Sequence, residues 1–160
     1  MTTIKTKLLD EKPSKDKIIL PASDFPNYYW EVKYVKDMTA SWEVYVAVNQ
    51  SEIELNLFEK NDLLFVAIEQ GIFVLNTSDG STICSITDTS YVQSIEETSA
   101  GIVLIPSEDE LLAFSQNGNL LWRTTFPDVI EDIEEQDSQI EILDISSETY
   151  RVDIFTGKPV

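Results

Sequence analysis

Three turn signals recur along the chain at nearly constant spacing. They are Asp79-Gly80, Asn117-Gly118 and Thr156-Gly157, and their glycines are 38 and 39 residues apart. Glycine in such a dipeptide is the usual residue at the positive-φ position of a tight β-hairpin turn. The chain is therefore constrained to successive β-units of about 40 residues each.

Each unit resolves into four short segments rich in apolar and β-branched residues. No stretch of ten residues has a helical period. The predicted strands are 53–59, 63–69, 71–76 and 81–86 in the first unit; 91–96, 101–106, 110–115 and 119–125 in the second; and 128–134, 139–145, 149–154 and a stub at 158–160 in the third. An all-β repeat of this length indicates antiparallel propeller blades.

One motif carries a family resemblance. Glu110–Trp122 reads Glu-Leu-Leu-Ala-Phe-Ser-Gln-Asn-Gly-Asn-Leu-Leu-Trp, and Gly71–Gly80 and Val152–Lys158 follow the same pattern. It resembles the repeat of quinoprotein-like β-propellers, in which an Asn-Gly or Thr-Gly turn precedes a strand ending in Trp. Ile83 and Ser85 stand where the first unit would carry that Trp.

The resemblance covers residues 52–160 and implies at most three blades. Closed propellers have four to eight. We therefore expect an open, partial propeller whose trough is lined by the first strand of each unit. A quinone site needs a complete ring, so no cofactor is expected.

The N-terminal third has a different character. Residues 28–48 alternate as a β-hairpin with a five-residue loop at 37–41, which places Trp42 opposite Lys36 and lets the hairpin cover one flank of the repeats. Prolines interrupt residues 1–27, which we expect to form an arm. The predicted organisation is thus an arm followed by a single all-β domain over 28–160.

The chain is strongly and unevenly acidic. It has 29 acids and 11 bases, a net charge of −18; residues 1–37 contribute +1 and residues 38–160 contribute −19. Such a field repels nucleic acid and anionic membranes and attracts basic proteins. The longest apolar run, Leu63–Ile68, is too short to span a bilayer, and no signal peptide is visible, so we expect a cytoplasmic protein.

Several kinds of chemistry are excluded by composition. The chain has no His, and Cys84 is its single Cys, so Ser-His-Asp and Cys-His catalysis, His-ligated metals and internal disulfides are all ruled out. A carboxylate pair such as Glu131 with Glu96 could serve a hydrolase, but acids are too abundant here for a pair to be informative. We expect a protein that is not an enzyme and holds no metal.

The sharpest local feature is Asp128–Asp137, with six acids in ten residues; Thr124–Tyr150 holds nine acids and no base. Simple alternation along the predicted strand puts Ile130 and Asp132 on one face, and Glu131 and Ile133 on the other. The candidate partner-binding residues are Asp128, Glu131, Asp132, Glu134, Glu135, Asp137, Glu96 and Glu97, with Tyr91, Phe126 or Trp122 as an aromatic anchor.

Three functions fit these observations. A small, acidic chain without catalytic residues resembles immunity proteins of bacterial toxin systems such as contact-dependent growth inhibition, which implies a basic, nuclease-type toxin domain as partner. An acidic trough could occlude an active site that normally binds phosphates. The alternatives are a propeller-like scaffold module and, less favoured, a carboxylate-dependent hydrolase.

Overall fold

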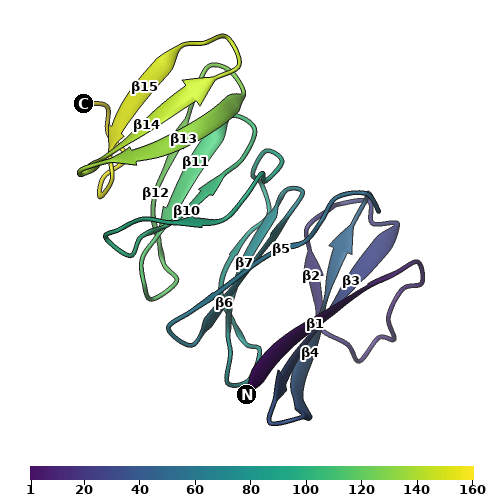
Figure 1. The fold of residues 1–160 in the computed structure, drawn as a ribbon. Coiled ribbons are helices and arrows are strands. Elements are labelled where there is room, and N and C mark those ends of the chain that lie inside the picture. The colour runs from purple at the N-terminus through teal and green to yellow at the C-terminus, as the bar shows by residue number, and fades with distance from the viewer. The chain divides into compact units, whose positions relative to one another are not determined.

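The structure, a computed structural model, describes all residues 1–160 and contains strands and turns but no helix (Figure 1). Its fifteen strands form four small sheets, which confirms the all-β prediction. No helix is available that could cross a membrane. The chain divides into two compact units, Met1–Asp88 and Thr89–Val160, whereas the sequence predicted an arm and one domain over 28–160.

The first sheet contains β1 (Thr2–Leu9), β2 (Ile19–Pro21), β3 (Tyr28–Lys36) and β4 (Thr39–Val48), in the order β1-β3-β4-β2. Residues 1–27, expected as an arm, thus supply both of its edge strands. β1 pairs with β3 along its whole length, and β2 runs parallel to β4. The prolines permit this because Pro13 and Pro26 lie outside strands and Pro21 ends an edge strand.

The hairpin within this sheet has a different register from the predicted one. Asp37 and Met38 alone form the turn, with φ of 51° and 67°, so the five-residue loop was wrong. Trp42 consequently lies opposite Tyr34 rather than Lys36, and the two rings stack with centroids 5.2 Å apart. A bulge after Tyr34 absorbs the change in register.

The second sheet completes the first unit. It contains β5 (Asn56–Lys60), β6 (Leu63–Ile68), β7 (Gly71–Asn76) and β8 (Thr82–Ile86) in chain order. Every residue of β6 is buried, as expected of a central strand covered on both faces. Side chains of both sheets form one core that includes Val32, Val44, Val46, Leu64, Val66, Phe73 and Leu75.

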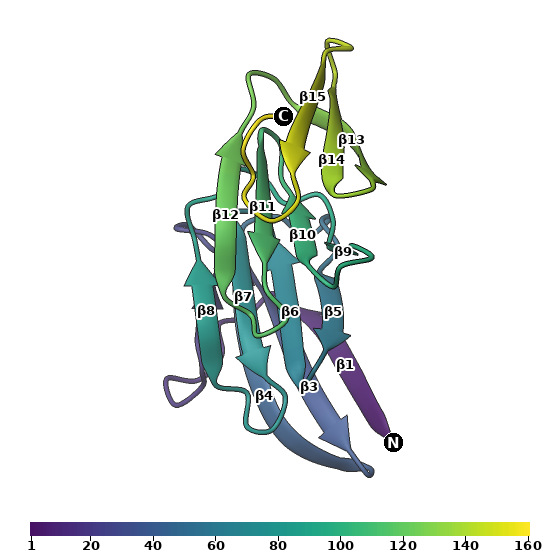
Figure 2. The same ribbon diagram turned by 90° about the vertical axis from the view of Figure 1, so that its left-hand side faces the viewer.

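The second unit has the third and fourth sheets. The third contains β9 (Glu96–Glu97), β10 (Val103–Pro106), β11 (Glu110–Phe114) and β12 (Leu120–Thr125); the fourth contains β13 (Ile130–Gln136), β14 (Gln139–Asp144) and β15 (Thr149–Asp153). Figure 2 shows the strand order β12-β11-β10-β9 of the third sheet. The strand predicted at 91–96 shrinks to β9, and the predicted C-terminal stub makes one bridge, from Pro159 to Val152.

A tryptophan joins the two sheets within each unit. In the first unit, Trp42 Nε1 donates a hydrogen bond of 2.8 Å to the carbonyl of Thr77, and its ring lies against Gly80. In the second, Trp122 Nε1 donates a bond of 2.9 Å to Ile154, and its ring lies against Gly157. In both cases the accepting carbonyl is three residues before the glycine. We call this arrangement the Trp–Gly interlock.

The interlock explains why the turn residue must be glycine. Gly80, Gly118 and Gly157 have φ of 74°, 80° and 65°, which confirms the positive-φ turns expected from the repeat. At Gly157 a Cβ would lie 2.5 Å from two carbons of the Trp122 ring. Backbone conformation and ring contact therefore both exclude a side chain there.

The interlock predicts strong coupling between these two positions. Gly157→Ala should lower the free energy of unfolding by about 2–4 kcal/mol, from left-handed strain and the ring clash together. In a Trp122→Leu background the clash is absent, and only the strain, about 1–2 kcal/mol, should remain. Urea unfolding of the wild type, the two single variants and the double variant measures this double-mutant cycle. Strictly additive changes in the free energy of unfolding would contradict the interlock.

Candidate functional site

The acidic segment Asp128–Asp137 lies mostly on β13, an edge strand whose only partner is β14. A bulge interrupts this pairing, because Ile130 lies opposite Asp144 and Asp132 lies opposite Leu143, which leaves Glu131 as the extra residue. The predicted alternation of faces was therefore wrong. The bulge allows Ile130 and Ile133 to pack against the same core although they are three residues apart.

At the bulge and just beyond it, three acidic side chains point away from the core. Glu131, Asp132 and Glu134 are exposed. Glu134 lies opposite Glu141, a pairing of like charges that is unfavourable across neighbouring strands. Arg151 on β15 binds Glu141 at 2.8 Å, so the one nearby base is already engaged.

Glu135 has a structural role in addition to its charge. Its carboxylate accepts a 2.8 Å hydrogen bond from the backbone N–H of Ser99 and another from the Ser99 hydroxyl. Ser99 follows β9 in the third sheet, so this contact links β13 to that sheet. Glu135 is thus oriented inside the unit, unlike its exposed neighbours.

A small cavity brings four of the predicted residues together. Its volume is about 40 Å³, enough for water but not for a sugar ring or an organic ligand. It is lined by Glu96, Glu97, Thr98, Leu104, Ile133, Glu134, Glu135 and Ile140. Glu131, the other member of the hydrolase-type pair with Glu96, is not part of this lining.

The remaining predicted residues divide between surface and core. Asp137 is exposed in the β13–β14 turn, and Asp128 is half-buried and accepts a bond from the N–H of Val129. Tyr91 is half-buried. Phe126 and Trp122, in contrast, are only 6% and 8% exposed and belong to the core, so the structure corrects their assignment as partner anchors.

The second unit concentrates the charge of the chain. It contains fifteen acids and three bases, a net charge of −12, whereas the first unit carries −6. Of the three bases, Arg123 binds Glu110 and Arg151 binds Glu141, which leaves Lys158 near the C-terminus. These two ion pairs engage acids of β11 and β14. Acids thus outnumber bases five to one in this unit.

Asp144, one of the nine acids of Thr124–Tyr150, has a structural role that was not predicted from the sequence. It is 1% exposed; Oδ1 accepts bonds from Ser146 and from the backbone N–H of Glu148, and Oδ2 accepts one from Tyr150. Desolvation opposes ionisation, but these hydrogen bonds prevail and hold the pKa of Asp144 below its usual value. The Asp-x-Ser pattern, typical of Asx turns, was the available signal.

Comparison with known proteins gives the fold alone. No protein-family model matches the chain, and no curated protein matches it. Among solved structures, it is similar to the computationally designed Ika8 protein (13% identity, TM-score 0.54) and to Saccharomyces cerevisiae Sqt1 (11% identity, TM-score 0.55), covering 83% of this chain and 44% of each of theirs. A protein of unknown function from Bacteroides caccae matches at 15% identity and a TM-score of 0.44, over 89% of this chain and 58% of that one. The chain thus spans about half the length of these structures.

The hydrogen bonds of Asp144 predict a specific response to acid. Because its pKa is lowered on folding, the stability it contributes is present above the unfolded pKa of about 3.9 and is lost as pH falls through the folded pKa. Asp144→Asn should lower the free energy of unfolding at pH 7. It should also make the fall in that free energy between pH 5 and pH 2 shallower than in the wild type, as measured by urea unfolding. The exposed Asp137→Asn is the matched control; an Asp144→Asn curve parallel to wild type would contradict this account.

Proposed function

We propose that this chain is a non-enzymatic binding protein whose second unit recognises a basic protein. The surface that carries the proposal is the β13 acidic face, defined as Asp128, Glu131, Asp132, Glu134 and Asp137 together with Glu96 and Glu97 on β9. The supporting observation is that exposed carboxylates of β9 and β13 lie close together in a unit whose net charge is −12.

Electrostatics explains why such a face favours a cationic partner. Exposed like charges on neighbouring strands repel one another in the free protein, and a partner's Lys and Arg side chains would relieve that repulsion. The field of a unit with a net charge of −12 would also accelerate encounter with a basic protein. Glu135, already held by Ser99, would keep the strand oriented before binding.

Within this class we propose an immunity protein that neutralises a nuclease-type toxin domain by covering its active site. Nuclease sites are basic because they bind phosphates, and closely spaced carboxylates can take the place of those phosphates. A scaffold module would use the same face without inhibition. A carboxylate-dependent hydrolase is less favoured, because the cavity among these acids has only about 40 Å³.

We also infer that the sheets are propeller-like blades in an open array. Two features support this inference: the second and third sheets have the same strand order, and both have a bulge at the equivalent step, after Val74 and after Ala113. The hairpin, which was expected to cover a flank of the repeats, forms the centre of a four-stranded sheet that packs against the first repeat sheet.

Charge reversal on β13 tests the proposed function. Glu131→Lys, Asp132→Lys and Glu134→Lys are combined in one variant, and Glu11→Lys, Glu52→Lys and Glu54→Lys, exposed acids of the first unit, in a matched control. The wild type and both variants are used in parallel to capture proteins from the source cells. We expect basic proteins retained by the wild type and the control to be lost with the β13 variant.

Binding kinetics and activity measurements with the captured partner test electrostatic recognition and inhibition separately from the location of the binding face. The wild-type association rate should fall about tenfold or more between 20 mM and 150 mM salt, and nuclease activity of the partner should be inhibited by wild type and control only. Equal capture by the β13 variant would contradict the site. A salt-independent association rate would contradict electrostatic recognition, and binding without inhibition would favour the scaffold.

A further inference from the structure

The first unit has an unpaired strand edge of unusual length. β1 spans eight residues, pairs on one side with β3, and is the edge of its sheet. The usual strand has about five or six residues. An exposed edge offers backbone N–H and C=O groups to any extended chain that can lie beside it.

The two faces of β1 differ in chemistry. Ile4 and Leu8 pack against the core, so Thr3, Lys5 and Lys7 lie on the opposite face. Residues 1–9 contain no acid. On the same face of the sheet, Lys33 binds Glu31 at 2.9 Å, and Lys17 and Lys33 both bind Glu43. Lys5 and Lys7 form no ion pair.

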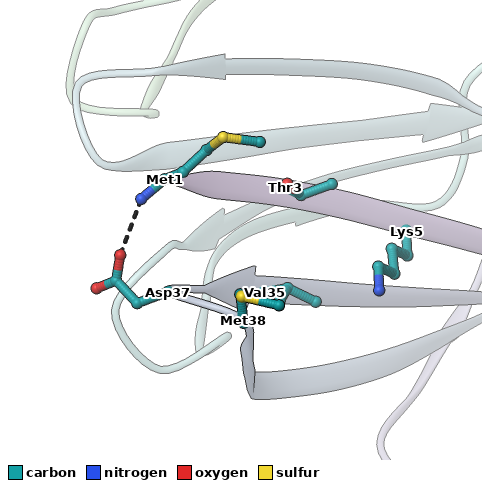
Figure 3. A pocket seen from close by; sticks show the side chains of 6 residues that line it. All are labelled: Met1, Thr3, Lys5, Val35, Asp37 and Met38. Atoms are coloured by element: carbon teal, nitrogen blue, oxygen red, sulfur yellow. Dashed lines mark hydrogen bonds and ion pairs between the residues drawn. The ribbon is translucent and has the colours of Figure 1, made fainter.

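A groove lies on the face of the sheet that carries Thr3 and Lys5, where the start of β1 meets β3 and the β3–β4 turn. It has a volume of about 640 Å³, within the range of ligand pockets, and is lined by Met1, Thr3, Lys5, Val35, Asp37 and Met38 (Figure 3). Met1 and Met38 are 95% and 98% exposed. Methionine side chains are flexible and polarisable, which suits them to receiving varied apolar groups.

The groove is held in place by contacts at the turn. The amino group of Met1 binds the Asp37 carboxylate at 2.8 Å, and the N–H of Asp37 donates to the carbonyl of Met1 at 3.1 Å. These bonds fix the beginning of β1 against the β3–β4 turn. Asp37 is thereby engaged with the terminal amine, so the charge presented farther along the edge is that of Lys5 and Lys7.

We propose that the β1 edge binds an extended segment of another protein that carries acidic residues at alternate positions and an apolar residue beside them. The segment would add a strand to the first sheet, its carboxylates lying next to Lys5 and Lys7 and its apolar side chain entering the Met-lined groove. The same lysines oppose pairing of β1 with β1 of a second copy, because like charges would meet across the strands.

A palindromic peptide tests this in either strand direction. The probe is fluorescein-labelled Leu-Thr-Glu-Thr-Glu-Thr-Leu, whose Glu side chains are two residues apart like Lys5 and Lys7; binding to the full chain is followed by fluorescence polarisation. We expect saturable binding. In NMR spectra of the protein, the backbone amide signals that shift on binding should be confined to β1 and the β3–β4 turn. Replacing both Glu residues of the peptide by Lys should weaken its affinity for the protein at least tenfold.

Variants of the protein test which of its side chains contact the peptide. Lys5→Glu with Lys7→Glu should weaken binding at least tenfold, and Met38→Ser about threefold or more. Lys12→Glu with Lys15→Glu makes the same change in charge on exposed residues outside β1 and should leave affinity within twofold of wild type.

Three results would overturn the proposal. The first is that the probe does not saturate at millimolar protein. The second is that the Lys12/Lys15 control loses as much affinity as the Lys5/Lys7 variant. The third is that two peptides, each N-methylated at the alternate amides of one of its two hydrogen-bonding edges, both bind as well as the unmodified probe. Because the site lies in the first unit, the Glu131/Asp132/Glu134 reversal should not weaken this peptide, which separates its outcome from that of the acidic face.

Discussion

The structure of each unit depends on one contact, in which a tryptophan of one sheet lies on the turn glycine of the other. The indole N–H satisfies a backbone carbonyl that the turn leaves open, and the ring covers a backbone that has no Cβ. Hydrophobic packing alone is non-directional and would allow two sheets to slide. The hydrogen bond and the close ring contact fix the position of one sheet relative to the other. They thereby also fix the strands that carry the acidic residues.

The two units therefore share a construction but differ in charge. The first has its lysines largely in β1 and the segment after it, whereas the second has few bases, and two of these are paired. Core residues explain none of this difference, since both cores consist of the same aliphatic and aromatic types. The difference belongs to the surface, which is where recognition is determined.

Much of the fold could be read from the sequence because its signals are local. The apolar runs and the glycine turns gave the bounds of β7 correctly and those of β6 and β11 to within one residue. The pairing of β1 with β3 was missed, since it joins residues 20 to 34 positions apart and leaves no local signature. At the site, composition located the acids, but the β13 bulge and the Glu135–Ser99 bond depend on neighbouring strands. Burial of Phe126 likewise arises from packing against Tyr150.

The bulge at Glu131 also bears on how this surface can change over generations. An insertion or deletion in a strand normally reverses every side chain beyond it and exposes the core. Here the extra residue is accommodated where it stands, and Ile130 and Ile133 keep their places in the core. An added residue at this point of the acidic edge is thus compatible with an unchanged core.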